Sequence, residues 1–111
     1  MTISTTGTDV VVALIQDRAL DAGNSRDFRS AVECLFKPGA KLVFDLSELE
    51  FIDSTGIGAL VSCLRQAHGS EAEIRLCALN QPVQAVFDLV RLNRVFQIYN
   101  NPAEAVNSYP N

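Results

Sequence analysis

The stretch that decides the fold is Lys41-Leu-Val-Phe-Asp-Leu-Ser-Glu-Leu-Glu-Phe-Ile-Asp-Ser-Thr-Gly-Ile-Gly-Ala-Leu60. Its first part, residues 41–46, is short, mostly apolar and rich in β-forming residues, which predicts a strand. Its last part predicts a helix, because apolar residues recur on one helical face at Ile57, Leu60, Val61 and Leu64. The polar turn between them can cap that helix, and the free amides of the first turn stabilise an anion. A hydroxyl at this turn is therefore well placed to carry a phosphate.

Strands and helices alternate along the rest of the chain. We expect strands at residues 9–15, 41–46, 71–78 and 95–99, with an edge strand or a frayed end at 1–8 and a connection at 16–21. We expect helices at about 25–36 and from 54 to about 68, a third helix capped by Asn80, and a short helix from Pro102. This alternation with short connections indicates an α/β domain with a partly parallel sheet. A length of 111 residues leaves room for one domain, residues 1–111.

Composition excludes several classes of function. A net charge of −4 disfavours binding to a phosphate backbone, and the arginines do not form a basic stripe, so no nucleic acid is expected as a partner. The N-terminal residues do not read as a signal peptide, and no apolar run is long enough to span a membrane. Cysteines and the single histidine, His68, show no metal-ligand spacing, so neither a metal site nor a cofactor site is expected.

The three cysteines, Cys34, Cys63 and Cys77, are interpreted as small buried hydrophobes in a reducing cytoplasm. A redox-sensing thiol is the alternative. In the first helix, the expected buried stripe consists of Phe28, Ala31, Val32 and Leu35.

Residues Phe51-Ile-Asp-Ser-Thr-Gly-Ile-Gly58 resemble the signature of STAS domains, and most closely that of the bacterial anti-sigma factor antagonists. A second block, which includes Cys77-Ala78, Pro82-Val83 and Phe87-Asp88, is also similar to the family. The resemblance covers nearly the whole chain. It implies a single STAS domain with a mixed sheet of four or five strands and helices packed mainly on one side. In one departure, the segment before Leu20-Asp21 lacks the glycine that the family often has there.

The resemblance also implies a function, which is a non-enzymatic, cytoplasmic partner switch with no catalytic residues. The unphosphorylated protein would bind an anti-sigma factor that is also a serine kinase, and phosphorylation on Ser54 would release it. A metal-dependent serine phosphatase would reset the cycle. The residues expected to contact the partner are Asp21, Asp53, Thr55, Gly56, Ile57 and Gly58. The oligomeric state, a homodimer included, stays open.

Simpler interpretations stand beside these. In the simpler interpretation the Ser54 hydroxyl is only a helix cap, with Thr55 as the second candidate hydroxyl, and the glycines only allow tight packing. The carboxylates of Asp45, Glu48, Glu50 and Asp53 form either a solvated loop or an acidic surface that steers a basic partner. The alternative function is a STAS module that binds a nucleotide or a lipid, or an accessory subunit of a transporter. No phosphate-binding lysine lies near the glycines, which counts against a nucleotide.

Overall fold

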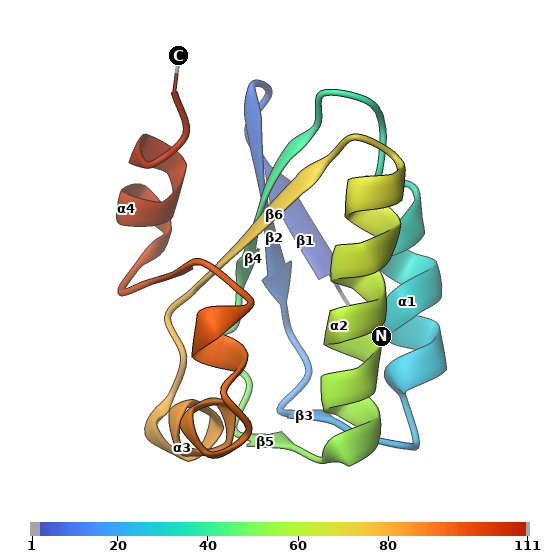
Figure 1. Cartoon of the computed structure of the whole chain (residues 1–111), viewed down its shortest axis with the longest axis vertical. Helices are drawn as coiled ribbons and strands as arrows, with labels where there is room; N and C mark the ends of the chain where they lie inside the picture. The colour runs from blue at the N-terminus through green and yellow to red at the C-terminus, as the bar shows by residue number, and fades with distance from the viewer. Residues whose placement is uncertain (1–2, 111) are drawn as a thin grey trace.

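The structure, a computed structural model, describes residues 3–110, and its centre is a five-stranded sheet in the order β1-β2-β4-β6-β7 (Figure 1). The strands are β1 (Ile3–Thr6), β2 (Val10–Ile15), β4 (Lys41–Asp45), β6 (Glu73–Cys77) and β7 (Ile98–Tyr99). β1 runs antiparallel to β2, and the other neighbours are parallel. The predicted mixed sheet is therefore confirmed with five strands, and the described part of residues 1–8 forms its edge.

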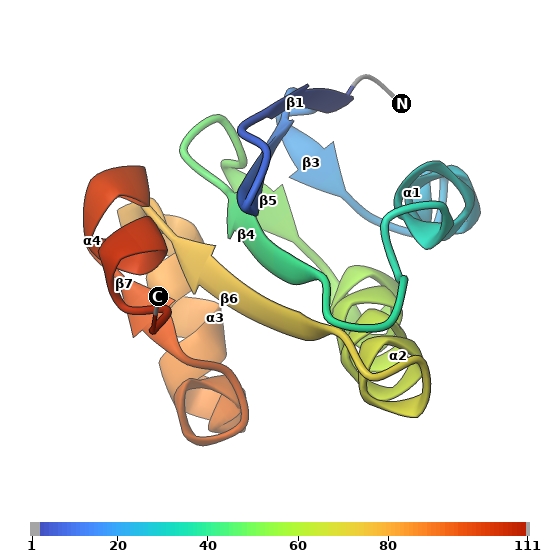
Figure 2. The same ribbon diagram turned by 90° about the horizontal axis from the view of Figure 1, so that it is seen from above.

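Helices cover both faces of this sheet, as Figure 2 shows. α1 (Ser25–Glu33) and α2 (Ser54–Gly69) lie side by side on one face, and the short α4 (Pro102–Asn107) lies on the other. α3 (Gln81–Val90) and the 3₁₀ turn η1 (Leu92–Arg94) pack together near the end of the sheet where the parallel strands finish. Within residues 3–110, no helix is both long and apolar enough to cross a membrane.

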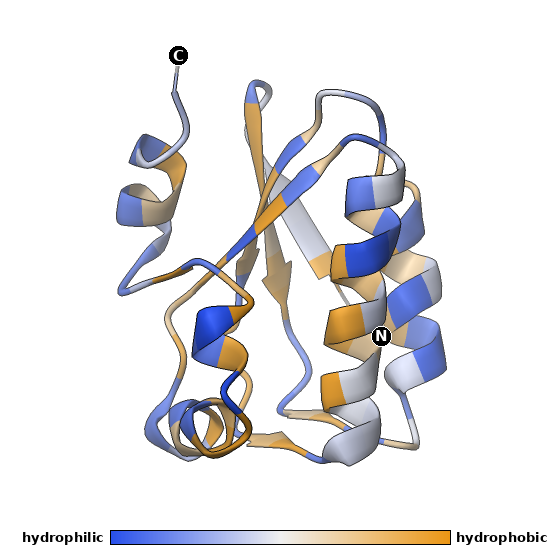
Figure 3. Ribbon diagram, in the orientation of Figure 1, coloured by the Kyte–Doolittle hydropathy of each residue, from blue (hydrophilic) through white to orange (hydrophobic). Residues whose placement is uncertain are grey.

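The period-two alternation of the strands divides the core into two parts. Leu42 and Phe44 of β4 point toward α1 and α2, where the Phe44 ring meets Phe28 edge-on at 6.0 Å between centroids. Val43 of the same strand points toward α4 and packs with Cys77. In Figure 3 most central strands carry hydrophobic colour, β6 alternates between hydrophobic and hydrophilic residues, and the helices carry both kinds.

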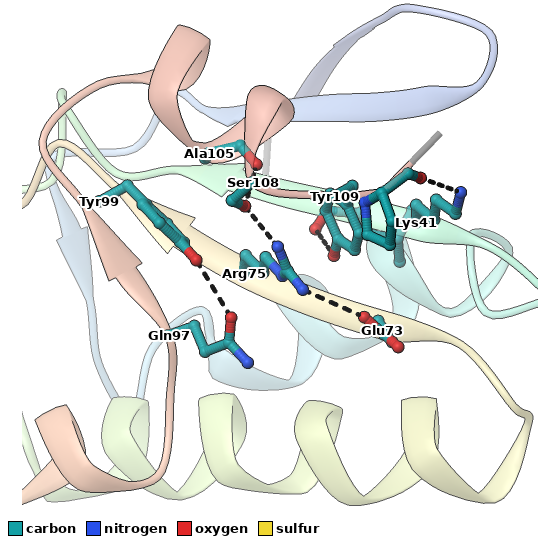
Figure 4. A network of polar contacts seen from close by, with 10 residues as sticks. Lys41, Glu73, Arg75, Gln97, Tyr99, Ala105, Ser108 and Tyr109 are labelled. Atoms are coloured by element: carbon teal, nitrogen blue, oxygen red, sulfur yellow. Dashed lines mark hydrogen bonds and ion pairs between the residues drawn. The ribbon is translucent and has the colours of Figure 1, made fainter.

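A polar network around Arg75 closes the face under α4 (Figure 4). Its guanidinium lies 3.9 Å from the centre of the Tyr109 ring, donates to the Ser108 hydroxyl, and approaches the Glu73 carboxylate to 3.6 Å. The Tyr109 hydroxyl donates to the carbonyl oxygen of Leu42 at 2.7 Å. Burial raises the pKa of Tyr109 to about 12, despite the lowering effect of the nearby guanidinium. These contacts tie the C-terminal segment to β4 and β6.

The first helix differs from its prediction at its C-terminal end. α1 ends at Glu33 rather than near residue 36. Phe28 and Val32 are buried as predicted, but Ala31 is exposed, because the buried stripe follows residues four apart along the helix. The prediction that all three cysteines are buried is wrong for Cys34, which follows the last residue of α1 on the solvent side, and right for the other two.

The predicted strand at residues 95–99 is also shorter in the structure. The amides of Val95 and Phe96 both donate to the carbonyl oxygen of Leu92, at 3.0 and 2.9 Å, so the chain continues the turn of η1 before it extends. Only Ile98–Tyr99 pairs with β6.

The predicted connection at residues 16–21 contains a strand. β3 (Ala19–Leu20) pairs in parallel with β5 (Phe51–Ile52) to form a second, two-stranded sheet. Two-residue strands are too short to leave a periodic pattern in the sequence. This small sheet lies at the carboxyl end of the central strands and leads directly into α2 (Figure 1).

Replacing Tyr109 by phenylalanine tests the attachment of the C-terminal segment. The variant keeps the ring over Arg75 but loses the buried hydrogen bond to Leu42, so the free energy of unfolding should fall by about 1 kcal/mol. Urea unfolding measures the change. The control is Tyr99→Phe, which removes an exposed hydrogen bond to Gln97 and should alter stability by less than about 0.5 kcal/mol. Equal effects of the two substitutions would contradict a structural role for the buried bond.

Candidate functional site

The cap of α2 is Asp53, not Ser54. Asp53 has extended backbone angles (φ −106°, ψ −176°), and its Oδ1 atom accepts a hydrogen bond from the Gly56 amide at 2.9 Å. Its Oδ2 atom accepts a second one, from the amide of Ala22 at 3.4 Å. The interpretation of Ser54 as a helix cap is therefore wrong, because the residue one position earlier already binds the free amide.

Ser54 is the first residue of α2, and its side chain is exposed. Among residues 3–110, no hydrogen bond or ion pair involves its hydroxyl. The amides of Ser54 and Thr55 belong to the first turn, where no carbonyl of the same helix can accept them. Thr55 is exposed as well. The turn thus presents a free hydroxyl beside unpaired donors at the positive end of a helix dipole.

The two glycines of the turn have different surroundings. A Cβ atom on Gly56 would lie 2.1 Å from the carbonyl oxygen of Leu20 and 2.9 Å from Cγ1 of Ile52, far inside van der Waals contact. Gly56 is therefore required by the close approach of α2 to the small sheet. A Cβ atom on Gly58 would meet nothing within 4 Å among residues 3–110, so no contact of the described chain explains that glycine. Ile57, between them, is half-buried and packs against the main core.

The turn that follows β3 brings Asp21 next to the α2 cap. The amide of its neighbour Ala22 donates to Asp53, so the two segments are joined directly. The Asn24 side chain holds this turn, since its Oδ1 atom accepts from the Asp21 amide at 2.9 Å and its Nδ2 atom donates to the Ala19 carbonyl at 2.7 Å. A turn thus forms here although the family glycine is missing.

The acidic loop, residues 45–50, lies on the other side of the cap. Asp45 braces the loop, because its Oδ1 atom accepts a hydrogen bond from the Ser47 amide at 2.9 Å. Asn80 stands at the N-cap position of α3 as predicted, but its side chain makes no capping hydrogen bond. Its Nδ2 atom instead donates to the carbonyl oxygens of Ser47 and Leu49, at 2.7 and 3.0 Å. Side-chain donors that hold a distant loop leave no local pattern, so the sequence did not reveal this role.

Phe51, which follows the acidic loop, was not among the predicted site residues. Its side chain is 55% exposed, whereas the next residue of β5, Ile52, is buried. The signal was available in the alternation of a strand, because a buried residue 52 implies an outward residue 51. The strand itself, however, was not predicted.

Within residues 3–110, no side chain is hydrogen-bonded to the Ser54 hydroxyl. His68, the single histidine of the sequence, lies in the last turn of α2, at the opposite end from Ser54. In the described part of the chain, no three potential metal ligands lie together.

Alanine at residues 53 and 54 separates the cap from the free hydroxyl. Asp53→Ala should lower the free energy of unfolding by about 1 kcal/mol, because it removes the cap and the tie to Ala22. For a domain of this size the melting temperature should then fall by roughly 4–8 °C. Ser54→Ala should change stability by less than about 0.5 kcal/mol. Thermal unfolding of both variants checks this, and a larger loss for Ser54→Ala would contradict the assignment of the cap.

Alanine at the two glycines should change stability in opposite directions. Gly56→Ala should destabilise by about 1–3 kcal/mol, because the new methyl group collides with the backbone of Leu20. Gly58→Ala should stabilise by about 0.5–1 kcal/mol, since alanine is the better helix former and the space is open. Urea unfolding of the matched pair measures both. Destabilisation by Gly58→Ala would show that this glycine also serves the fold.

Comparison with known proteins identifies the family. Residues 2–105 match the model of the STAS domain. The chain is 33% identical over 100 residues to a Thermotoga maritima protein provisionally named an anti-sigma factor antagonist, with 88% of each chain covered. It is 28% identical over 86 residues to the anti-sigma-B factor antagonist of Listeria monocytogenes, covering 77% of this chain and 75% of that one. The crystal structure of a T. maritima protein with the same provisional name matches at a TM-score of 0.82 and 28% identity, over 95% of this chain and 92% of that one. The chain therefore belongs to the STAS domain family, among the anti-sigma factor antagonists.

Proposed function

We propose that this protein is the phosphorylation-controlled component of a partner switch. Without phosphate it binds an anti-sigma factor that is also a serine kinase, and so frees a sigma factor. Phosphorylation on Ser54 separates the two proteins, and a metal-dependent serine phosphatase restores the binding form. The observation that carries the proposal is the exposed Ser54 hydroxyl, which makes no bond within the described chain and stands on the first residue of α2.

The chemistry is supplied by the partners. In the kinase, the Ser54 oxygen attacks the γ-phosphorus of ATP, the bond from that phosphorus to ADP breaks, and a base of the kinase takes the hydroxyl proton. In the phosphatase, a metal-activated water attacks the phosphorus and the serine oxygen leaves. ATP and metal ions belong to those enzymes, and the ATP requirement places the cycle in the cytoplasm.

The fold tolerates the phosphate because the groups around Ser54 are free to bind it. Unpaired amides of the first helical turn point toward this position, and the helix dipole favours a negative charge there. The cap itself is unaffected, because it is made by Asp53 and not by the modified hydroxyl. Phosphorylation therefore changes the surface of the protein rather than its architecture.

The partner, in contrast, meets a new charge in a close-fitting contact. A phosphoserine adds about −1.5 to −2 charges at pH 7. Directly after transfer it faces the terminal phosphate of the ADP that has just been formed. Two unit charges 4 Å apart interact by about 4 kcal/mol at an effective dielectric of 20. A loss of a few kcal/mol lowers the affinity 100-fold or more.

The alternative of a nucleotide-binding module receives less support. A hollow of about 390 Å³ lies at this end of the molecule, lined by Gln16, Arg18, Ser47, Glu48, Glu50 and Asn80. Its one cation, Arg18, is already paired with Glu50 at 2.9 Å. A nucleotide phosphate placed there would face carboxylates without a free cation.

Incubation with the cognate kinase and ATP tests the switch. The protein should gain one phosphate, on Ser54, as measured by intact mass and peptide mapping. Ser54→Ala should abolish the modification and keep the partner bound in the presence of ATP. Ser54→Asp should weaken the complex, though less than phosphorylation, because it carries a single charge.

Thr55→Ala is the matched control, since Thr55 is the exposed hydroxyl next to Ser54. This variant should still gain the phosphate. A phosphate that persists in Ser54→Ala, or a Ser54→Asp variant that binds as tightly as the wild type, would refute the proposed switch.

A further inference from the structure

The backbone of Phe51 is hydrogen-bonded in the small sheet, while its side chain is exposed to solvent. The Phe51 amide donates to the carbonyl oxygen of Arg18 at 3.1 Å, and the residue pairs with Ala19 across the small sheet. Two residues later, the Asp53 amide donates to Leu20 at 3.3 Å. The strand is thus fixed on both sides of an aromatic ring that remains 55% exposed.

The interior of the domain does not account for this aromatic side chain. The buried residue of β5 is Ile52, at 4% exposure, and the outward position of a strand accepts a polar residue as readily. Large apolar side chains are exposed at four positions of the described chain, and the other three, Leu89, Val90 and Val95, lie on or after α3. Phe51 is the one that lies three residues from Ser54.

The surroundings of Phe51 are acidic. Glu48 and Glu50 are exposed on the loop before it, and the carboxylate of Asp53 follows it. Arg18, the basic residue across the small sheet, is already paired with Glu50 at 2.9 Å. Glu48 keeps its charge unpaired within residues 3–110, so a partner that covers the ring is matched by an apolar pocket with positive charge on the side that faces Glu48.

We propose that Phe51 is the apolar anchor by which the unphosphorylated protein docks on its anti-sigma factor. The ring enters an apolar pocket of the partner, and a lysine or arginine side chain at the edge of that pocket faces Glu48. Aromatic residues are enriched among the few that dominate binding energy in interfaces, typically at positions where a ring fills a desolvated pocket. The inference rests on the proposed function, because it names the chemistry of the same partner.

The short distance along the chain gives the anchor a second consequence. Three residues of extended chain span at most about 11 Å, so docking of Phe51 determines where the Ser54 hydroxyl stands in the partner. The acidic loop and the ring then contact protein, while Ser54 reaches the nucleotide. A phosphate on Ser54 is repelled by ADP and disturbs the fit of the neighbouring ring at the same time.

The experiment measures the affinity of unphosphorylated variants for the purified kinase that phosphorylates the wild-type protein. Isothermal titration without ATP should show a roughly 30-fold loss for Phe51→Ala, which is the scale of a dominant interface residue. Phe51→Leu, which stays apolar, should lose less. The control is Leu89→Ala, which truncates a side chain that is 83% exposed on α3 and should bind within twofold of the wild type.

A charge variant tests the nature of the pocket edge. Glu48→Lys should slow association and weaken the dependence of the association rate on salt, because it reverses a charge that steers the encounter. Melting temperatures are measured for every variant. If Phe51→Ala lowers the melting temperature by more than a few degrees, its affinity is not used. The affinity of Phe51→Leu, compared with that of the wild type at equal stability, then decides whether the ring is the anchor.

The outcomes separate the anchor from the switch. Phosphorylation on Ser54 with unchanged affinity of Phe51→Ala would overturn the anchor alone, as would a larger loss in Leu89→Ala than in Phe51→Ala. Faster association of Glu48→Lys would overturn the basic edge of the pocket. If the wild-type protein neither binds nor is phosphorylated by any serine kinase anti-sigma factor of its genome, the proposed function and the anchor both fail.

Discussion

The contact between Gly56 and the carbonyl oxygen of Leu20 fixes the start of α2, and the position of every proposed functional group follows from it. Only a residue without a Cβ atom lets the helix come this close to β3, since a methyl group there would stand 2.1 Å from that oxygen. The same carbonyl oxygen accepts a hydrogen bond from the Asp53 amide at 3.3 Å. One backbone group of β3 therefore contacts both the residue after β5 and the first turn of α2. In this position of the helix, its first residue, Ser54, is exposed to solvent. The turn after β3 and the acidic loop lie next to the start of the helix.

The division of roles between Asp53 and Ser54 suits the reversible modification that we propose for Ser54. If the Ser54 hydroxyl capped the helix, a phosphate on it would remove the cap each time the protein was modified. Here the capping carboxylate lies one residue earlier and also holds Ala22. The Ser54 hydroxyl makes no hydrogen bond within the described residues, and the unpaired amides beside it remain available to an anion. A change of binding state then leaves stability nearly untouched.

The sequence predicted the elements with strong periodicity and missed those that depend on contacts distant in the chain. β4 and α2 were clear because each carries a regular apolar pattern, and the resemblance placed Ser54 at the start of α2, where the structure has it. The small sheet was missed because two residues show no period, and with it the outward position of Phe51. The roles of Asn24 and Asn80 were equally hidden, because an asparagine that holds a neighbouring loop reads like one that caps a helix. The order of the elements could thus be predicted from the sequence, whereas the roles of single residues in tertiary contacts could not.

The placement of these groups also decides what kind of switch this fold can be. Ser54 and Phe51 are three residues apart, and the acidic loop directly precedes them. In the proposed switch, a phosphate on Ser54 would therefore act within the proposed docking surface itself. Coupling through the fold would need a second arrangement of the domain that the phosphate favours. The free amides and the separate cap remove that need, because they accommodate the phosphate in the present arrangement. On this argument the free energy of the proposed switch would arise at the interface, from charge and fit against the partner, and the α4 face with its Arg75 network would stay unchanged through the proposed cycle.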